Sequence, residues 1–304
     1  MIALALVLMA RPAAADPIAS SYVYGIDNSG FIWELDPVQK TQRSVFDTLL
    51  GGTTNAFAYD NSRDQMFFVD SSKNLWYWNH ATTVSQIATA SQLGVSSLPQ
   101  PWNAAYYANA YWFFNTESDE LSKVSLTYGG GTPAFDSLTT YAISGIPYTT
   151  VPGDRNRFGD IAIVTSGGAA GMLYAATASP SGTDAMFYSL DLNSLTTTGV
   201  ATVIKATGNP NLQLSFNADE SVLYGQDSAG AWYELDLGTG NLGSPIAGFT
   251  TLAFRDLAGA DNTRAAVPEI PSGGAGAALS VLAAGLALVD RRSRRTVRGD
   301  QPRP

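Results

Sequence analysis

The stretch DNSGFIWELD, residues 27–36, returns 200 residues later as DSAGAWYELD, residues 227–236. The two segments align without a gap and share Asp, Gly, Glu, Leu and Asp at matched positions. A third copy is DSSKNLWYWN, residues 70–79, and looser copies end at Ser125 and Asp191. Self-similarity of this kind indicates a repeat architecture.

Each copy has the pattern of a β-hairpin. A strand rich in aromatic and β-branched residues runs into a turn of Asp, Asn, Ser and Gly, where Gly30 and Gly230 can adopt the positive φ that tight turns need. A second strand follows, with large apolar and polar residues in alternation. The strands predicted before the turns are residues 22–26, 66–69 and 222–224.

Further predicted strands flank the hairpins, which makes four antiparallel strands per unit. Those before the hairpins are residues 55–59, 103–107, 160–164 and 212–216, and those after them are residues 84–87, 140–143, 200–204 and 244–247. The third strands end at residues 36, 79, 125, 191 and 236, in steps of 43, 46, 66 and 45 residues. Three steps match the ~40–45 residues of a propeller blade. The long step matches an insertion, residues 129–157, expected in loops at the rim or on one face.

The two ends of the repeat region complement each other. The first hairpin, from Tyr22, has no strand before it, and the last unit is followed by a lone strand, residues 251–256, whose pattern matches residues 56–60. A C-terminal strand that completes the N-terminal blade would close the ring and remove its open edge. We therefore predict an all-β, five-bladed β-propeller over residues 16–260. A β-sandwich is the alternative, because strand spacing alone does not separate the two.

Composition excludes several classes of function. The chain has no Cys, so disulfides, thiolate metal sites and Cys nucleophiles are absent. Residues 16–266 hold 23 acidic and 10 basic residues, a formal charge of -13, while the whole chain carries -9. A body with this acidic balance has no basic patch to neutralise phosphates, which disfavours nucleic acid as a partner.

Both ends of the chain have the pattern of segments that act in export. Residues 1–15 form an apolar stretch followed by Ala13-Ala14-Ala15, which fits the cleavage site of a signal peptide. Residues 261–271 form a linker, and residues 272–289 form an uncharged run at the low edge of a membrane span. The basic segment 290–304 would stay cytoplasmic; its first arginines are Arg291, Arg292, Arg294 and Arg295.

The C-terminal segment resembles the PEP-CTERM sorting signal of exopolysaccharide-producing Gram-negative bacteria. Val267, Pro268 and Glu269 match the start of its motif, Ile270 replaces the usual second Pro, and a span and an Arg cluster follow in order. The resemblance covers about a tenth of the chain and implies recognition by a membrane-embedded exosortase, then processing and release or surface attachment. A plain membrane anchor is the alternative for this segment.

Catalytic and metal-binding patterns are weak. His80 is the single His, and we interpret it as an exposed turn residue, because a Ser-His-Asp set must be shown by geometry. Aspartates recur at repeat spacing, which indicates side chains that bond nearby turn N–H groups rather than a Ca²⁺ site; these are Asp27, Asp36, Asp60, Asp70, Asp191, Asp227 and Asp236. The adjacent pairs Asp119-Glu120 and Asp219-Glu220 point apart in an extended chain, and residues 129–131 are not a phosphate loop.

The sequence predicts no catalytic residue, metal or cofactor. Trp102 lies in a predicted loop and is the candidate residue for stacking on a sugar. The function we expect is that of an exported binding or scaffolding module of the cell envelope, outer surface or extracellular matrix. It would be transiently anchored in the inner membrane, with polysaccharide as the expected partner. An envelope enzyme on a propeller, such as a glycan hydrolase or lactonase, is the rival hypothesis. It requires carboxylates or metal ligands that converge at the central channel.

Overall fold

The computed structural model describes residues 22–50, 53–98, 100–101, 103–115, 120–145, 157–178, 186–206 and 212–259. These residues belong to one compact unit, Ile18–Arg264. The predicted signal peptide, the linker, the C-terminal segment with its sorting motif and arginines, and Trp102 all lie outside the described residues.

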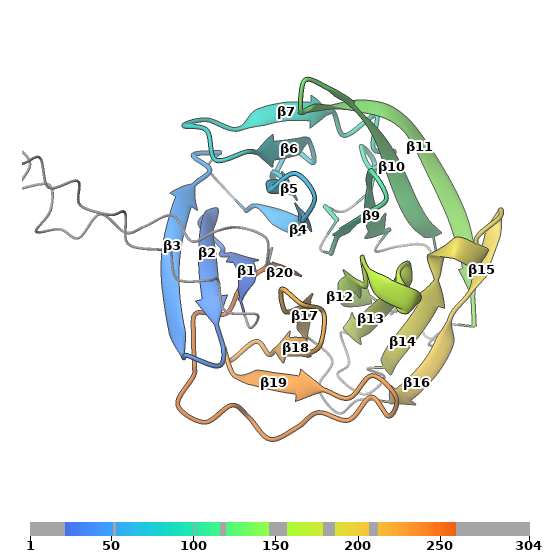
Figure 1. Ribbon diagram of the computed structural model, residues 1–304. Helices are drawn as coiled ribbons and strands as arrows, with labels where there is room; N and C mark the ends of the chain where they lie inside the picture. The colour runs from blue at the N-terminus through green and yellow to red at the C-terminus, as the bar shows by residue number, and fades with distance from the viewer. Residues whose placement is uncertain are drawn as a thin grey trace, which may run out of the picture. The chain divides into compact units, whose positions relative to one another are not determined.

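The described residues form five β-sheets arranged in a ring around a central axis (Figure 1). Blade 1 holds β20 (Asp256–Gly259), β1 (Val23–Ile26), β2 (Phe31–Asp36) and β3 (Thr41–Asp47). Blade 2 holds β4 (Asn55–Asp60), β5 (Gln65–Val69), β6 (Leu75–Trp78) and β7 (Ser85–Ala88). Blade 3 holds β8 (Ala105–Tyr107), β9 (Ala110–Phe114), β10 (Glu120–Gly129) and β11 (Thr132–Ser144), with β15 (Thr198–Val200) added outside β11.

The remaining two blades complete the ring. Blade 4 holds β12 (Arg157–Ile163), β13 (Met172–Ala178), β14 (Met186–Asp191) and β16 (Thr202–Ala206). Blade 5 holds β17 (Gln213–Phe216), β18 (Leu223–Gln226) and β19 (Trp232–Leu235). Two 3₁₀ turns follow strands of blade 4: Gly167–Ala169 joins β12 to β13, and Leu192–Ser194 joins β14 to β15. Neither is long and apolar enough to cross a membrane, and the described residues hold no other helix.

The inner strands of neighbouring blades contact each other in a closed order: β20 with β4, β4 with β8, β8 with β12, β12 with β17, and β17 with β20. This arrangement confirms the predicted five-bladed propeller and excludes the β-sandwich. The predicted third strands coincide with β2, β6, β10, β14 and β19.

The closing strand lies further along the chain than predicted. β20 pairs antiparallel with β1, with Ile26 opposite Asp256 and Val23 opposite Gly259, so the predicted strand at residues 251–256 is wrong. Residues 250–255 instead connect blade 5 to blade 1: the Thr251 N–H donates to Gly230 O at 3.1 Å, and the Arg255 N–H donates to Ile26 O at 2.8 Å. Residues 250–255 have the hydrophobic alternation of an inner strand, but the N–H groups of Thr251 and Arg255 are already used in these two hydrogen bonds.

Blade 5 lacks the predicted fourth strand at residues 244–247. The Gly243 N–H donates to Glu234 O and the Ile246 N–H donates to Trp232 O, both at 2.8 Å, so this segment follows β19 through scattered hydrogen bonds. Pro245 has no N–H and cannot extend a regular ladder. An irregular loop therefore covers the outer edge of β19 (Figure 1).

The insertion at residues 129–157 is strand in part, which corrects the prediction of loops. β10 and β11 form a long hairpin whose turn contains Gly130 and Gly131, at φ values of +60° and +87°. The end of β11 pairs in parallel with β15, with Ala142 opposite Thr198 and Ser144 opposite Val200. Because β15 lies between β14 and β16 in sequence, this pairing joins blade 3 to blade 4.

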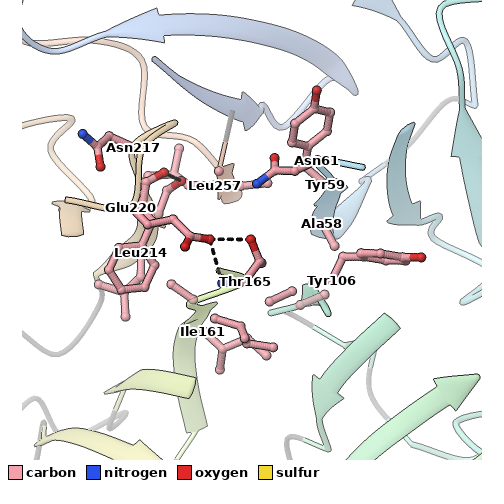
Figure 2. A pocket seen from close by; sticks show the side chains of 18 residues that line it. Ala58, Tyr59, Asn61, Tyr106, Ile161, Thr165, Leu214, Asn217, Glu220 and Leu257 are labelled. Atoms are coloured by element: carbon pink, nitrogen blue, oxygen red, sulfur yellow. Dashed lines mark hydrogen bonds between the residues drawn. The ribbon is translucent and has the colours of Figure 1, made fainter. Parts of the chain in front are cut away.

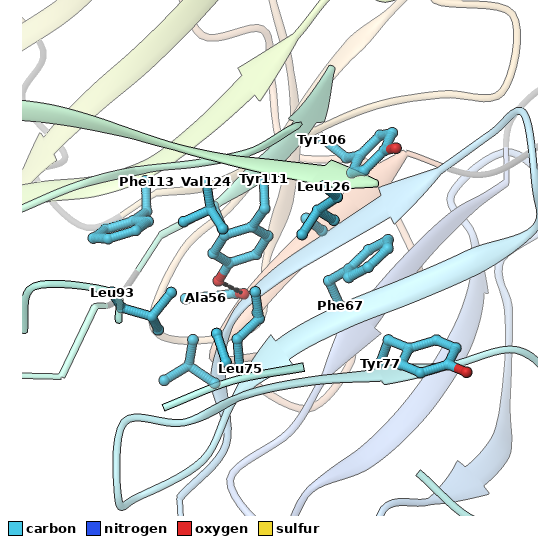
Figure 3. Packing of buried hydrophobic residues seen from close by; sticks show 14 of the residues in the cluster. Ala56, Phe67, Leu75, Tyr77, Leu93, Tyr106, Tyr111, Phe113, Val124 and Leu126 are labelled. Atoms are coloured by element: carbon cyan, nitrogen blue, oxygen red, sulfur yellow. Dashed lines mark hydrogen bonds between the residues drawn. The ribbon is translucent and has the colours of Figure 1, made fainter. Parts of the chain in front are cut away.

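Apolar side chains fill the spaces between blades. In Figure 3, Phe67 and Leu75 of blade 2 pack against Phe113 and Val124 of blade 3, and the Tyr111 hydroxyl donates to Ala56 O at 2.5 Å across the same seam. Tryptophan side chains also pack between blades. Trp78 of blade 2, for example, stacks on Phe46 of blade 1 with ring centroids 4.2 Å apart.

Candidate functional site

The aspartates at the hairpin turns hold the turns together, as the sequence predicted. Asp27 Oδ1 accepts hydrogen bonds from the Ser29 and Phe31 N–H groups at 2.8 and 3.0 Å, and Oδ2 accepts from Trp33 Nε1 at 3.0 Å. Asp70 and Asp227 repeat this arrangement: Asp70 Oδ2 accepts from Trp76 Nε1, and Asp227 Oδ2 from the Tyr233 hydroxyl, both at 2.9 Å. These carboxylates have structural partners and do not converge on a ligand.

The other repeat-spaced aspartates also bond to turn backbone. Each accepts the N–H of the residue two positions on, at 2.9–3.0 Å; these are Asp36, Asp60, Asp191 and Asp236. Asp219 does the same with Ser221 at 3.1 Å. Among the described residues, no group of three or more His, Cys, Asp or Glu side chains is placed to hold a metal ion.

His80 lies in the turn after β6, at the seam between blades 1 and 2. Its Nε2 is 2.8 Å from Asp64 Oδ1, which also accepts the Tyr59 hydroxyl at 2.8 Å. The His80 ring also packs against Trp78, with centroids 4.4 Å apart. His80 is thus a turn residue, as predicted, but it is half-buried rather than exposed.

A ring of polar side chains that sequence reasoning missed surrounds the start of the channel. Each inner strand carries a carboxyl or amide residue at or near its start; in blade 4 this residue, Asp160, lies within β12 after a register shift. All five are buried: Asn55, Asn103, Asp160, Gln213 and Asp256. The polar ring recurs once per blade, in steps of 48, 57, 53 and 43 residues, so the signal was present in the sequence, but its members differ in residue type.

Two members of the polar ring, Asp160 and Asp256, are carboxyls with no exposed surface. In each, Oδ1 accepts the N–H of the next residue, at 2.6 Å from Ile161 and 2.9 Å from Leu257. Asp160 Oδ2 accepts the Leu214 N–H of blade 5 at 2.7 Å. Asp256 Oδ2 accepts the Phe57 N–H of blade 2 at 2.6 Å. Both carboxyls therefore link the inner strands of neighbouring blades.

Asp160 and Asp256 are also hydrogen-bonded to each other. Burial raises the pKa of both carboxyls above the ordinary range of Asp, and the hydrogen bonds from backbone N–H groups offset this only in part. No cationic side chain pairs with either of them within the described part of the chain. Two carboxyls that face each other in a buried site cannot both ionise readily, so the pair retains a proton at neutral pH.

Further along the same inner strands, the channel contains a cavity of about 30 Å³ (Figure 2). This volume accommodates one or two water molecules. The polar side chains of its lining include Asn61, Thr165, Asn217 and Glu220, and we call these four residues the channel mouth. Glu220 accepts the N–H and hydroxyl groups of both Thr165 and Ser166, so its carboxylate bridges blades 5 and 4. Asn61 Oδ1 is buried without a hydrogen-bond partner.

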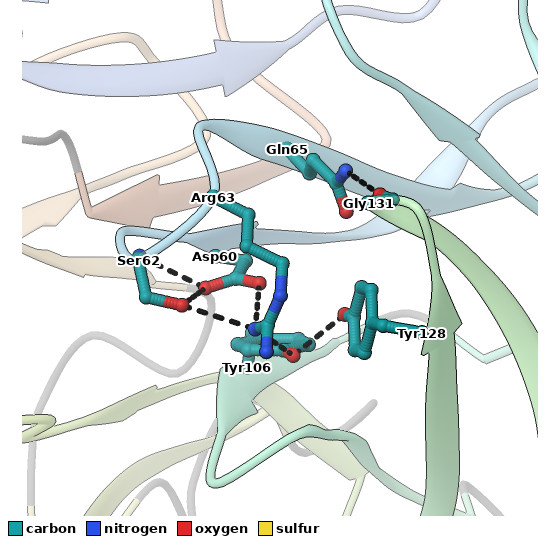
Figure 4. Close-up of polar contacts among 7 residues, drawn as sticks. All are labelled: Asp60, Ser62, Arg63, Gln65, Tyr106, Tyr128 and Gly131. Carbon is teal, nitrogen blue, oxygen red and sulfur yellow. Dashed lines mark hydrogen bonds and ion pairs between the residues drawn. The ribbon is translucent and has the colours of Figure 1, made fainter.

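Tyr106 connects the channel to a second polar cluster at the seam of blades 2 and 3 (Figure 4). Its hydroxyl lies 2.7 Å from the Tyr128 hydroxyl, and the Arg63 guanidinium carbon lies 3.8 Å from the Tyr128 ring centroid. Arg63 donates to Asp60 at 2.9 Å. Burial is the main cause that raises the pKa of the Tyr128 phenol, to about 12. Both phenols thus stay protonated at physiological pH.

Comparison with known proteins finds only distant structural similarities. No family model matches the chain, and no curated protein matches it in sequence. Among solved structures, a nidogen/laminin complex has 10% identity over 78% of this chain and 97% of its own, with a TM-score of 0.46. An auxiliary nutrient binding protein from Bacteroides thetaiotaomicron has 12% identity over 76% of this chain and 56% of its own, also with a TM-score of 0.46. The WD40 β-propeller domain of Doa1 has 11% identity over 76% and 65%, with a TM-score of 0.39. At such identities the similarity concerns the fold alone.

Proposed function

We propose that the protein is an exported β-propeller that acts as a binding or scaffolding module at the cell envelope, outer surface or extracellular matrix. The observation that carries this proposal is the use of the body's carboxylates. The turn aspartates, the Asp160–Asp256 pair and Glu220 all accept hydrogen bonds from the protein's own backbone or side chains. The cavity of about 30 Å³ is also too small to enclose a sugar ring. A rigid body with these properties is suited to contact a partner through its surface.

The route of delivery rests on the C-terminal segment. Three features in this order support sorting by an exosortase-like enzyme after export. They are the motif Val267-Pro268-Glu269, an apolar run, and the cluster Arg291, Arg292, Arg294 and Arg295. Intact mass of the protein isolated from its native host tests this proposal. Loss of the chain beyond about residues 268–271 supports sorting, whereas an intact membrane-bound form that ends in the basic segment supports a plain anchor.

The partner that we propose is a polysaccharide, bound at the channel mouth. Asn61 lines the cavity together with Tyr106 and Asn217, and its amide oxygen has no hydrogen-bond partner there. Carbohydrates present hydroxyl groups that can donate to such an acceptor. We expect Asn61→Ala to weaken binding about 3- to 10-fold, the effect of losing one hydrogen bond.

A glycan-binding screen with the full chain, followed by titration of the best ligand, tests this site. Gln86→Ala is the matched control, because Gln86 is an exposed amide on the outer strand β7. Equal losses in the two variants would place the ligand elsewhere. Turnover of the bound glycan, or of a lactone, would instead support the rival hypothesis of an envelope enzyme.

A further inference from the structure

The Asp160–Asp256 pair crosses the channel between blades that are not neighbours. β20 belongs to blade 1 and β12 to blade 4, with blade 5 between them in the ring, yet the two strands are in contact. Asp256 is also the first residue of the closing strand. The pair therefore connects the strand that closes the ring to the far side of the channel.

The hydrogen bonds around the pair favour a proton over a metal ion as the bridge. All four carboxyl oxygens already accept backbone N–H groups, those of Ile161, Leu214, Leu257 and Phe57. N–H donors that point at these oxygens repel a cation and leave few lone pairs for coordination. A shared proton needs only one lone pair on the accepting carboxyl and cancels one of the two negative charges of the pair.

Among the described side chains, none supplies a compensating positive charge to the pair: Arg255, next to Asp256, donates to Asn28 Oδ1 instead. Tyr111 on β9 is buried, and the charge of Asp256 further raises the pKa of its phenol. The titratable side chains on β1 and β13 are tyrosines, which are neutral when protonated: β1 carries Tyr24 and β13 carries Tyr174, while β17 carries no titratable side chain. β8 carries Tyr106 and Tyr107. β4 carries Tyr59 and Asp60 at the end away from Asn55, and Asn55 and Gln213 are neutral members of the polar ring.

We propose that Asp160 and Asp256 form a proton-dependent clasp, in which the shared proton holds the closing strand β20 in the ring and its loss loosens that strand. When the second carboxyl ionises, two like charges face each other in a buried site and repel. The strain falls on β20, because only four residues hold it against β1. The propeller is then most firmly closed in mildly acidic solution and loosens in alkaline solution.

The direction of the pH effect follows from proton linkage. The unfolded chain binds this proton only below about pH 4, the ordinary range of an Asp carboxyl, whereas the folded state keeps it to higher pH. The stabilisation is fully present below that pH and is lost as the pH rises through the raised pKa of the folded pair. This trend is opposite to that of an ordinary salt-bridged carboxylate.

Urea unfolding of the full chain in mild detergent, followed by tryptophan fluorescence between about pH 5 and 9, tests the clasp. While the folded state holds one more proton than the unfolded state, the ratio of folded to unfolded protein should fall roughly tenfold per pH unit. Asp256→Asn and Asp160→Asn should each remove this dependence, because an amide N–H replaces the shared proton. Asp27→Asn, a turn variant outside the pair, should keep it. A wild-type chain without the dependence, or Asn variants that retain it, would overturn the proposal.

Cleavage by trypsin reports locally on whether β20 is released, and it tests the clasp in the wild type even if an Asn variant folds poorly. Arg255 directly precedes Asp256, so cleavage after it reports release of β20, and cleavage after Arg43 on the outer strand β3 reports general loosening. In the wild type, raising the pH from about 7 to about 9 should increase cleavage at Arg255 relative to Arg43, after correction with an unstructured peptide. An equal rise at both sites would contradict the clasp. In wild-type protein labelled with ¹³C-aspartate, NMR at neutral pH should show one protonated carboxyl, and its absence would also contradict the clasp.

Discussion

Asp27, Asp70 and Asp227 each bind an aromatic side chain six residues further along the chain. The partners are Trp33, Trp76 and Tyr233, whose polar atoms donate to the second carboxylate oxygen at 2.9–3.0 Å. One oxygen therefore orders the turn and the other fixes the ring on the following strand. The spacing explains why the repeat keeps Asp at the turn and a Trp or Tyr on the strand.

The Tyr233 hydroxyl allows this motif to be tested with a small change. Tyr233→Phe removes its hydrogen bond to Asp227, which also raises the pKa of the Tyr233 phenol. We expect the free energy of unfolding to fall by about 1 kcal/mol, as measured by urea denaturation. Tyr141→Phe is the control, because the Tyr141 hydroxyl has no hydrogen bond to any described residue while its ring still stacks on Trp112. A loss in the control equal to that in Tyr233→Phe would show that the hydrogen bond is not the cause.

At the residue scale, the sequence predicted the role of the turn aspartates and missed the polar ring. Turn chemistry is local, so an Asp followed by Ser, Gly or Asn predicts its own hydrogen bonds. Asp160 and Asp256 acquire their role from Leu214 and Phe57, which are 54 and 199 residues away in sequence. Only the closed ring brings these residues together.

At the scale of single elements, the hairpin turns set the geometry of each blade. Gly230 has a φ of +82°, and a β-carbon at this position would collide with the carbonyl oxygen of Thr251. Thr251 also accepts the Trp232 Nε1 hydrogen bond at 2.9 Å. The turn of blade 5 thus lies directly against the segment that leads to the closing strand.

Gly230→Ala should destabilise the protein by at least about 2 kcal/mol, since left-handed backbone strain alone costs roughly 1–2 kcal/mol. Gly168→Ala is the matched control, because Gly168 has an ordinary φ and open space around it, and it should change stability by less than about 0.5 kcal/mol. Thermal or urea unfolding measures both variants. A tolerated Gly230→Ala would mean that the segment at Thr251 can move aside.

Element boundaries were less predictable than element number. The second and third strands of each blade follow from alternation and turn chemistry. The position of the closing strand does not follow from these signals, because residues 251–256 and 256–259 both have apolar residues in a strand-like pattern. Which of the two segments pairs with β1 depends on the hydrogen-bonding groups that β1 and β18 leave free. The Phe254 N–H, for example, donates to the Gln226 side-chain oxygen at 2.9 Å.

At the scale of the whole body, the propeller depends on a strand that is distant in sequence from its blade. β20 completes blade 1 from the other end of the repeat region, and Leu257 and Ala258 are buried in the seams beside it. A chain that ends at Arg264 retains this strand, and one that ends at Arg255 loses it. The number of blades was predictable because it follows from the repeat count and from complementary ends.

We expect the chain truncated after Arg264 to unfold in a single cooperative transition. The chain truncated after Arg255 should lose that transition, because β1 is left without its inner partner and the ring is open. Circular dichroism during urea titration distinguishes the two. Cooperative unfolding of the shorter chain would show that the other four blades are sufficient for a stable body.

The pairing of β1 with β20 has a mechanical consequence. The first residue of β1, Val23, lies opposite the last residue of β20, Gly259, so both chain ends leave the ladder from the same side. A pulling force applied between these two ends acts on one residue pair at a time and unzips the ladder, whereas a force along the strands would load all pairs together. Tension across this seam therefore opens the ring at low load, which makes the junction of the two ends the point where the body yields first.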